Sequence, residues 1–402
     1  MIGPQDVRAA AALIEGVAER TPVQRSRALS QLVGADVWLK CENLQRAGSF
    51  KIRGAYTRMV RLTQEEKVRG VVAASAGNHA QGVALAAGLL GLDAVIFMPI
   101  DAALPKVAAT RGYGARVELV GTSVDEALVA AHAHADRTGS VLIHPFDHPD
   151  VDAGQGTVAL EVLEQVPDVG TIVVPVGGGG LAAGIAAALA DRPDVRVVGV
   201  QAARAASYPV SLAAGRPVPA TELRTMADGI AVGMPGAVPF EVLASHQVPV
   251  RTVSEEDLSR ALLLVAERAK LVVEPSGAAA VAAVMADPGG FADDGRPVVC
   301  VLSGGNVDPI VLLRVIRHGL ASAGRYLQLH VVVEDTPGAL AELLREVAAM
   351  GGNVMHVSHL RTGGDLGFSD VAIDLQIETK GPEHCGTVLT GLRAAGYRLA
   401  SS

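Results

Sequence analysis

An apolar strand that runs directly into four consecutive glycines limits the folds open to this chain more than any other feature. No charged residue occurs between Val169 and Ala190, and residues 177–180 are all glycine. The segment is long enough to span a bilayer. Its glycines and Pro175 instead predict a strand, a loop and a helix in a protein core. The loop N–H groups and the helix N-terminus predict a phosphate site; a turn required only by packing is the alternative.

Two nucleotide-binding folds share this strand–glycine–helix pattern, and the residues that follow disfavour both. A dinucleotide fold needs an acidic residue about 20 positions further on. The next apolar strand, residues 195–200, ends instead at Gln201. No Lys-Ser or Lys-Thr pair follows the glycines, as a P-loop requires.

Short apolar runs alternate with helical patterns through the first 320 residues, which predicts an α/β fold with parallel sheets and right-handed crossovers. Strands are expected at residues 37–40, 71–74, 94–98, 115–120, 141–144, 171–176, 195–200 and 298–302. Helices are expected at residues 7–20, 79–90, 105–111, 124–137, 156–164, 181–190 and 254–270, with a loop at 145–152.

The pattern restarts after the small residues at 322–324. Residues 326–402 predict a separate ferredoxin-like βαββαβ unit. Its elements are expected at 326–333 (strand), 338–350 (helix), 354–360 and 370–377 (strands), 383–395 (helix) and a final short strand.

Charge and cysteine usage exclude several classes of partner. The net charge is −8, which argues against nucleic acid. Three scattered cysteines, Cys41, Cys300 and Cys385, form no CxxC pair, so we expect a reducing cytoplasm with neither disulfides nor zinc. The N-terminal residues lack the basic start and apolar run of a signal peptide. We therefore expect a cytoplasmic protein with no membrane or nucleic-acid partner.

Lys51 follows a loop at residues 43–48 and opens a helical pattern. A lysine at such a junction can be desolvated, which lowers its pKa and makes its amine a nucleophile able to form a Schiff base. An ordinary surface lysine is the alternative.

Two further loops lie where parallel strands end, and such ends are where open α/β sheets bind ligands. The first, residues 75–82, could hold a carboxylate on its backbone amides, and the Asn78 amide could bond a ring oxygen; an ordinary helix start is the alternative. His79 is interpreted as a structural polar residue rather than a general base. The second loop carries Ser303 at a strand end, where a simple turn is the alternative.

Taken in order, these features resemble the fold-type II pyridoxal-phosphate enzymes, and most of all the threonine (serine) dehydratases. The matching segments, within residues 5–320, are KCENLQRAGSFKIRGA, ASAGNHAQG, PFDHPDVDAGQGT, VPVGGGGLAAG, VVEPSGAA and LSGGN. The resemblance implies a catalytic domain at residues 1–320, with a smaller parallel-sheet domain at about 50–150 inserted in a larger one. It also implies β-elimination and deamination of L-threonine to 2-oxobutanoate and ammonia, and of L-serine to pyruvate.

The resemblance further implies roles for single residues. Lys51 would carry the Schiff base with pyridoxal 5′-phosphate and remove the α-proton. The implied cofactor contacts are Phe50, Lys51, Asn78, Gly177, Gly178, Gly179, Gly180, Leu181, Glu274 and Ser303. The implied substrate contacts are Ser75, Gly77, Asn78, His79 and Phe146. For Glu274, a surface position at a helix end is the alternative.

Serine racemases are similar, but three positions differ from their pattern. Ala76 stands where they carry a serine that acts as an acid. Gln201 and Ser207 stand where they carry carboxylates for a divalent ion. Because an amide and a hydroxyl are poor ligands beside carboxylates, we expect no metal at these positions. The sequence leaves open whether backbone carbonyls hold a monovalent cation.

Residues 326–402 resemble an ACT domain, an amino-acid-sensing module. Residues 335–338 close its first strand and 352–354 open its second, and Gly338 and Asn353 are the candidate regulatory residues. The free N–H groups of the helix after Pro337 could take the carboxylate of a branched-chain amino acid, isoleucine or valine. A domain that only mediates assembly into a homodimer or homotetramer is the alternative.

Two other functions stay open. A cysteine-synthase-like transferase would share the lysine and glycine loop but not PFDHPDVDAGQGT. A non-catalytic amino-acid sensor built on the ACT-like unit would not require Lys51.

Overall fold

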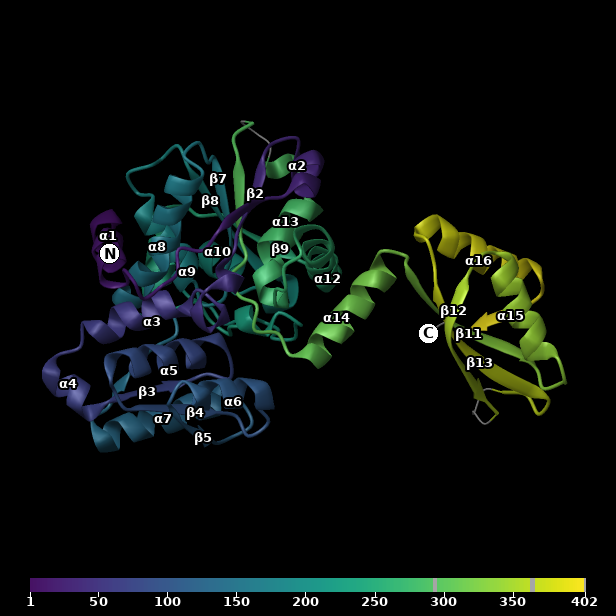
Figure 1. Ribbon diagram of the computed structural model, residues 1–402, viewed down its shortest axis with the longest axis horizontal. Coiled ribbons are helices and arrows are strands. Elements are labelled where there is room, and N and C mark those ends of the chain that lie inside the picture. The colour runs from purple at the N-terminus through teal and green to yellow at the C-terminus, as the bar shows by residue number, and fades with distance from the viewer. Residues whose placement is uncertain (292–294, 362–365, 401–402) are drawn as a thin grey trace. The chain divides into compact units, whose positions relative to one another are not determined.

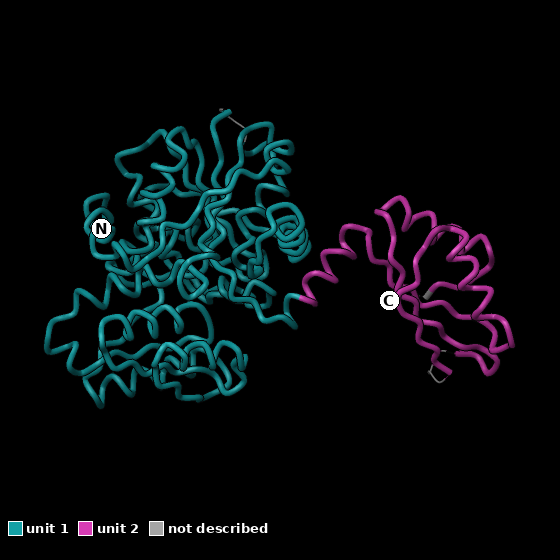
Figure 2. Tube along the Cα trace, viewed as in Figure 1, with its two compact units in different colours: residues 1–312 teal, residues 313–402 magenta. Residues whose placement is uncertain are grey.

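The computed structural model describes residues 1–291, 295–361 and 366–400. The chain divides into two compact units, residues 1–312 and 313–402 (Figure 2). The boundary falls inside helix α14, Pro309–Ser322.

A six-stranded sheet forms the centre of the first unit, in the order β1-β2-β10-β7-β8-β9 (Figure 1). Only β1 pairs antiparallel; all other neighbours are parallel. The predicted strands of this region are present, and the edge strands β1 and β9 were not predicted. The bounds are Val23–Arg25 (β1), Val37–Lys40 (β2), Thr171–Pro175 (β7), Arg196–Ala202 (β8), Val250–Val253 (β9) and Val298–Val301 (β10).

A second, smaller sheet is inserted between the segments of the first. Its order is β5-β4-β3-β6 and every pair is parallel, as the alternating pattern predicts. Its bounds are Val71–Ala74 (β3), Ala94–Met98 (β4), Arg116–Leu119 (β5) and Val141–Leu142 (β6). Figure 1 shows this sheet with α5, α6 and α7 around it.

Helices of the first unit mostly fall where the pattern places them. They are Pro4–Leu13 (α1), Arg27–Val33 (α2), Lys51–Val60 (α3), Gln64–Arg69 (α4), Asn78–Leu90 (α5), Leu104–Gly112 (α6), Val124–Thr138 (α7), Pro149–Gln165 (α8), Gly180–Ala188 (α9), Tyr208–Ala214 (α10), Ala237–Ser245 (α11), Glu255–Leu264 (α12) and Ala279–Ala286 (α13). The predicted helix 7–20 ends early, at Leu13. The predicted helix 254–270 changes after Leu264 into a π-helical turn, Val265–Ala269.

The start of α8 corrects the prediction most strongly. The helix begins at Pro149, so residues 149–152 are not the expected loop. His148 caps it, because its Nδ1 accepts a hydrogen bond from the Asp150 N–H, and proline suits the first helical position. The glycines that disfavour a helix here have a packing role. A Cβ on Gly154 would lie 2.6 Å from the Arg53 carbonyl oxygen, and one on Gly156 would overlap the Gly184 carbonyl, so α8 touches α3 and α9 through its backbone.

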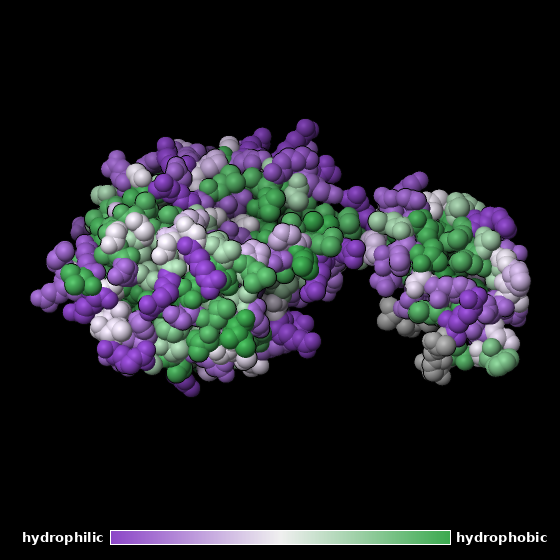
Figure 3. Space-filling model, turned by 60° about the horizontal axis from the view of Figure 1, so that its bottom comes forward, coloured by the Kyte–Doolittle hydropathy of each residue, from purple (hydrophilic) through white to green (hydrophobic). Residues whose placement is uncertain are grey.

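Three apolar clusters are present in the first unit, and the smallest packs α7 against the small sheet through Phe97 and Ala131. Of the other two, one surrounds the large sheet and includes Ile172, Val174 and Ile185; the second surrounds the small sheet and includes Ile52 and Ile96. On the face drawn in Figure 3, hydrophilic residues are interspersed with hydrophobic ones. Among the described residues, no helix has the length and apolar character needed to cross a membrane.

The second unit has its own sheet and core. Its elements follow the order βαββαβ: Tyr326–Glu334 (β11), Ala339–Ala349 (α15), Asn353–Leu360 (β12), Asp370–Glu378 (β13), Pro382–Ala394 (α16) and Arg398–Ala400 (β14). The sheet is antiparallel, in the order β12-β13-β11-β14. Leu343 and Val347 of α15 and Val388 of α16 pack in one cluster with strand residues such as Val331.

A buried ionic network holds α3 in place. The Arg53 guanidinium donates to both oxygens of Glu42, at 2.8 Å each, and to Glu161 at 2.7 Å. Arg53 and Glu42 are 0 % exposed. Lys40 extends the network, since its ammonium pairs with Glu161 and donates to the Thr21 carbonyl. Because Lys51 lies two residues before Arg53, this network positions the candidate lysine.

We expect Arg53→Met to lower the free energy of unfolding by about 3–5 kcal/mol, because it leaves the buried Glu42 carboxylate unpaired. The matched control is Arg8→Met, which removes the exposed pair with Asp191 and should cost about 0–1 kcal/mol. Urea unfolding followed by the fluorescence of Trp38, which lies on β2 of the first unit, measures both. Equal losses in the two variants would contradict the assigned role of the network.

Candidate active site

Lys51 lies where the two sheets of the first unit meet. It is the first residue of α3, and the N–H of Phe50 before it donates to the Ser303 carbonyl at 3.2 Å, at the end of β10. The Lys51 ammonium donates to the Pro145 carbonyl at 2.9 Å, in the loop before α8. Burial lowers the pKa of Lys51 to about 8, although Asp152 and Glu274 oppose the shift. A useful fraction of neutral amine therefore exists near neutral pH.

The glycine loop joins β7 to α9. Neighbouring side chains pack so closely on it that Gly178 and Gly179 could not carry side chains of their own. Gly179 has φ +107°, and a Cβ there would overlap the Tyr208 hydroxyl; a Cβ on Gly178 would overlap the Phe146 ring. The Tyr208 hydroxyl donates to the Gly178 carbonyl at 3.0 Å. The helix begins at Gly180, so its first N–H groups are without helical partners. The loop has the form of an anion cradle.

Phe146 links this loop to Lys51. It follows Pro145, the residue that accepts from the Lys51 ammonium, and its ring packs on Gly178. The His144 ring also meets the Phe146 ring edge-on. The predicted substrate residue Phe146 therefore lies between the lysine and the glycine loop.

The loop after β3 presents Ser75, Gly77 and Asn78 at the start of α5. The Gly77 N–H donates to the Ser75 hydroxyl at 3.1 Å. His79 is buried, and its Nε2 lies 2.7 Å from the Ile143 carbonyl oxygen. Burial lowers the pKa of His79 to about 3, so the imidazole is neutral and donates to that carbonyl.

Asn78 connects the small sheet to the large one. Its Nδ2 donates to Glu274 at 2.6 Å, and its Oδ1 accepts from Asn306 at 2.9 Å. Glu274 is 4 % exposed, so the alternative of a surface glutamate is wrong. Burial, reinforced by Asp228, raises the pKa of Glu274 to about 7. Ser303 is also buried, at the end of β10.

Three residues of this region were assigned no role from the sequence. Tyr208 supports the glycine loop, Asn306 bonds Asn78, and Asp152 is buried beside Gly180. Asn306 and Asp152 stand inside matched segments, so their position was a usable signal. Tyr208 carries no local signal, because only the tertiary fold brings α10 to the loop.

The two residues that replace the racemase carboxylates bond neutral groups. The Gln201 side-chain oxygen accepts from the Tyr208 N–H at 2.8 Å, and its amide donates to the Ser207 hydroxyl at 3.4 Å. Within the described part of the chain, no three His, Cys, Asp or Glu side chains gather as a metal site would require. The absence of a divalent ion stays a prediction.

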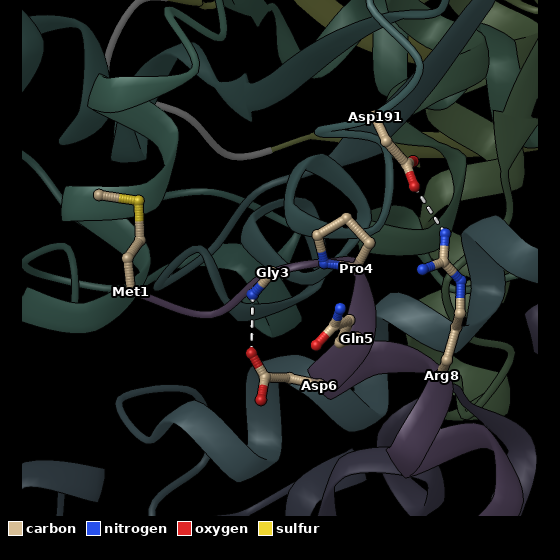
Figure 4. Close-up of a pocket in the computed structure, with 7 residues that line it drawn as sticks. All are labelled: Met1, Gly3, Pro4, Gln5, Asp6, Arg8 and Asp191. Carbon is tan, nitrogen blue, oxygen red and sulfur yellow. Dashed lines mark hydrogen bonds and ion pairs between the residues drawn. The ribbon is translucent and has the colours of Figure 1, made fainter.

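Two surface pockets lie outside this cluster. One is lined by Met1, Gly3, Pro4, Gln5, Asp6, Arg8 and Asp191, where Arg8 pairs with Asp191 (Figure 4), and it contains no predicted site residue. The other lies in the second unit, along residues 333–340 with His359, Arg361 and Val371. It includes Gly338 but not Asn353, whose amide bonds Glu378 on β13. The structure therefore does not bring the two candidate regulatory residues to one pocket.

Lys51, whose pKa is lowered, lies between the glycine loop and the buried Asn78–Glu274 pair. This arrangement is the one expected of an enzyme that uses pyridoxal phosphate. The loop fits the cofactor phosphate, because α9 begins at Gly180 and its first N–H groups have no helical partners. The family model for the pyridoxal-phosphate-dependent enzymes matches residues 14–304. The chain belongs to that family.

Comparison with individual proteins shows which members of the family this chain resembles. The L-threonine ammonia-lyase of Thermotoga maritima is 44 % identical over 400 residues, 99 % of each chain. The structure of threonine deaminase isoform 2 from Solanum lycopersicum is similar with a TM-score of 0.75 and 36 % identity, over 78 % of this chain and 92 % of that one. A maize serine racemase is also similar, with a TM-score of 0.74 and 36 % identity, over 80 % of this chain and 98 % of that one.

We expect Gly179→Ala to weaken pyridoxal phosphate binding at least about 10-fold, because the methyl group meets Tyr208 and the backbone is strained by about 1–3 kcal/mol. Gly215→Ala is the control, since Gly215 also has positive φ but a Cβ added there would meet no atom within 4 Å. Absorbance titration of cofactor-free protein measures both. Unchanged affinity in Gly179→Ala would show that the loop is not the phosphate site.

Proposed function

We propose that this protein is a threonine ammonia-lyase, which converts L-threonine to 2-oxobutanoate and ammonia and also converts L-serine to pyruvate. The observation that carries the proposal is Lys51 with its lowered pKa, in a chain matched from end to end by an L-threonine ammonia-lyase. A transferase or a racemase on the same fold is less well supported. Ala76 has no hydroxyl with which to return a proton.

Pyridoxal phosphate supplies an electron sink that acidifies the α-C–H bond of an amino acid. The residues that would hold it are Lys51 with Phe50 beside it, the loop from Gly177 to Leu181, Asn78, Glu274 and Ser303. Ser303 would offer the ring nitrogen of the cofactor a hydroxyl, which is a weaker partner than a carboxylate. Glu274 keeps the Asn78 amide in position through its 2.6 Å hydrogen bond.

The remaining residues bind substrate and move its proton. The substrate carboxylate would bind between Ser75 and His79 at the start of α5, where the helix dipole favours an anion. The neutral amine of Lys51 accepts the α-proton, a task suited to a base whose pKa lies near the working pH. Phe146 shields this space, and His79 holds α5 against the Ile143 carbonyl.

The second unit acts as an ACT regulatory domain in this proposal, with residues 1–320 as the catalytic domain and 326–402 as the regulatory one. Its βαββαβ order and its pocket at the start of α15 support the assignment. Asp335 and Arg361 pair at that pocket, so charged partners for both ends of an amino acid are present. Isoleucine or valine is the proposed effector, and a cytoplasmic homodimer or homotetramer is the proposed assembly.

We expect Lys51→Ala to abolish 2-oxobutanoate formation from L-threonine and to remove the visible absorbance of the bound cofactor, because Lys51 is the residue proposed to supply the amine. Lys67→Ala, in the surface helix α4, should retain both. Coupled oxo-acid assays and absorbance spectra measure these properties, and O-acetylserine with sulfide tests the transferase alternative. Full turnover of L-threonine by Lys51→Ala would contradict the proposed role of Lys51.

We expect isoleucine or valine to shift the affinity for threonine between about 5-fold and about 150-fold, the usual range of allosteric coupling. Gly338→Ala should reduce that response, because Gly338 has φ +100° at the start of α15. Gly381→Ala is the control: Gly381 also has positive φ before a helix, but it lies outside the pocket. Threonine saturation curves with and without each amino acid measure the shift. A chain that responds to no amino acid at millimolar concentration contradicts the regulatory role.

A further inference from the structure

Asp152 is a buried carboxyl group that the mechanism above does not use. It lies in the first turn of α8 and is 0 % exposed. Neither of its side-chain oxygens has a hydrogen-bond partner among the described residues. Asp150, two residues earlier, is ion-paired with Arg58 and Arg61. A buried polar group without partners is costly, so Asp152 calls for a functional explanation.

The Asp152 carboxyl group lies against the glycine loop. A Cβ on Gly180 would lie 2.6 Å from Asp152 Oδ1, so the glycine is what allows the carboxyl group to reach the start of α9. The Gly184 backbone packs on the Asp152 carbonyl one turn later. Both contacts hold the side chain beside the cradle.

Burial disfavours the charged form of the Asp152 carboxyl group. Burial raises its pKa well above the ordinary value, and Asp147 in the preceding loop adds to this effect. Lys51 on α3 opposes it, but the Lys51 ammonium donates to Pro145 and not to Asp152. Tyr208 on α10 also faces the group, and its hydroxyl is committed to the Gly178 carbonyl. Burial therefore favours the protonated form of the Asp152 carboxyl group, which has a hydrogen-bond donor to offer.

We propose that Asp152, as a neutral carboxylic acid, donates a hydrogen bond to the phosphate group held by the glycine loop. A phosphate monoester is largely dianionic near pH 7 and offers three acceptor oxygens. A hydrogen bond from an acid to such an anion is of the strong, charge-assisted kind. An ionised carboxylate at the same place would repel the phosphate, so the proton on Asp152 is what makes this residue compatible with the cofactor.

The test measures ligand binding without turnover, in full-length protein from which the cofactor has been removed. Pyridoxine 5′-phosphate is the probe, because it carries the phosphate but no aldehyde for Lys51. Pyridoxine, which lacks the phosphate, is titrated in parallel by calorimetry. The role of Asp152 rests on the cofactor family and not on the proposed substrate. If the protein did not turn over threonine, the binding of pyridoxine 5′-phosphate would still test this role.

Asp152→Ala and Asp152→Leu should each weaken binding of pyridoxine 5′-phosphate about 10-fold or more, the usual effect of losing a hydrogen bond to a charged group. Asp152→Asn keeps a donor and should stay within about 3-fold of the wild type. Pyridoxine binding should not change in any variant. Asp150→Ala is the matched control from the same helical turn and should bind both ligands as the wild type does.

Two results would overturn the proposal. If Asp152→Ala binds the phosphate ester as tightly as the wild type, or more tightly, the carboxyl group does not donate to the phosphate. If binding of both probes falls equally, Asp152 only supports the fold. Circular dichroism identifies a variant that does not fold. Asp152→Ala and Asp152→Leu are both made so that the test can still be carried out if one of them does not fold.

Discussion

The Arg53 guanidinium has no access to solvent, and its contacts determine where the candidate lysine, Lys51, lies. Arg53 binds Glu42 from the segment after β2 and Glu161 from α8, so one side chain ties three segments that are distant in sequence. Desolvating such charges is expensive, and only full pairing makes the arrangement tolerable. The helix that carries Lys51 therefore has little freedom to shift. The lowered pKa of Lys51 depends on that placement, since burial is its main cause.

Much of the first unit could be predicted because strand and helix periodicities are local properties. The apolar runs that become β3, β4, β7 and β10 are short and bounded by turns, and their parallel pairing follows from the helices between them. The start of α8 could not be predicted in the same way. Its glycines weaken a helix considered alone, and only the close approach of α3 and α9 explains them. The edge strands β1 and β9 lack a pattern long enough to recognise.

In the candidate site, too, some residues could be predicted from the local sequence, whereas others depend on the tertiary structure. Lys51, Asn78 and Ser303 each stand at a strand end or a helix start, so their positions could be read from the sequence. Whether Glu274 faced solvent could not, because its burial depends on Asn78 from the other sheet. Tyr208 and Asp152 were not assigned roles for a related reason. A tyrosine and an aspartate are ordinary surface residues until the packing of α10 and α8 against the glycine loop is known.

The separate cores of the two units affect how the unfolding of this chain has to be followed. The cluster around Leu343 and Val388 shares no residue with the clusters around the two parallel sheets. A protein built in this way need not melt in a single cooperative transition, so one midpoint for the whole chain is not a well-defined quantity. The single tryptophan, Trp38, lies on β2 of the first unit. Its fluorescence therefore reports the unit that carries Lys51, whereas far-ultraviolet circular dichroism averages over both.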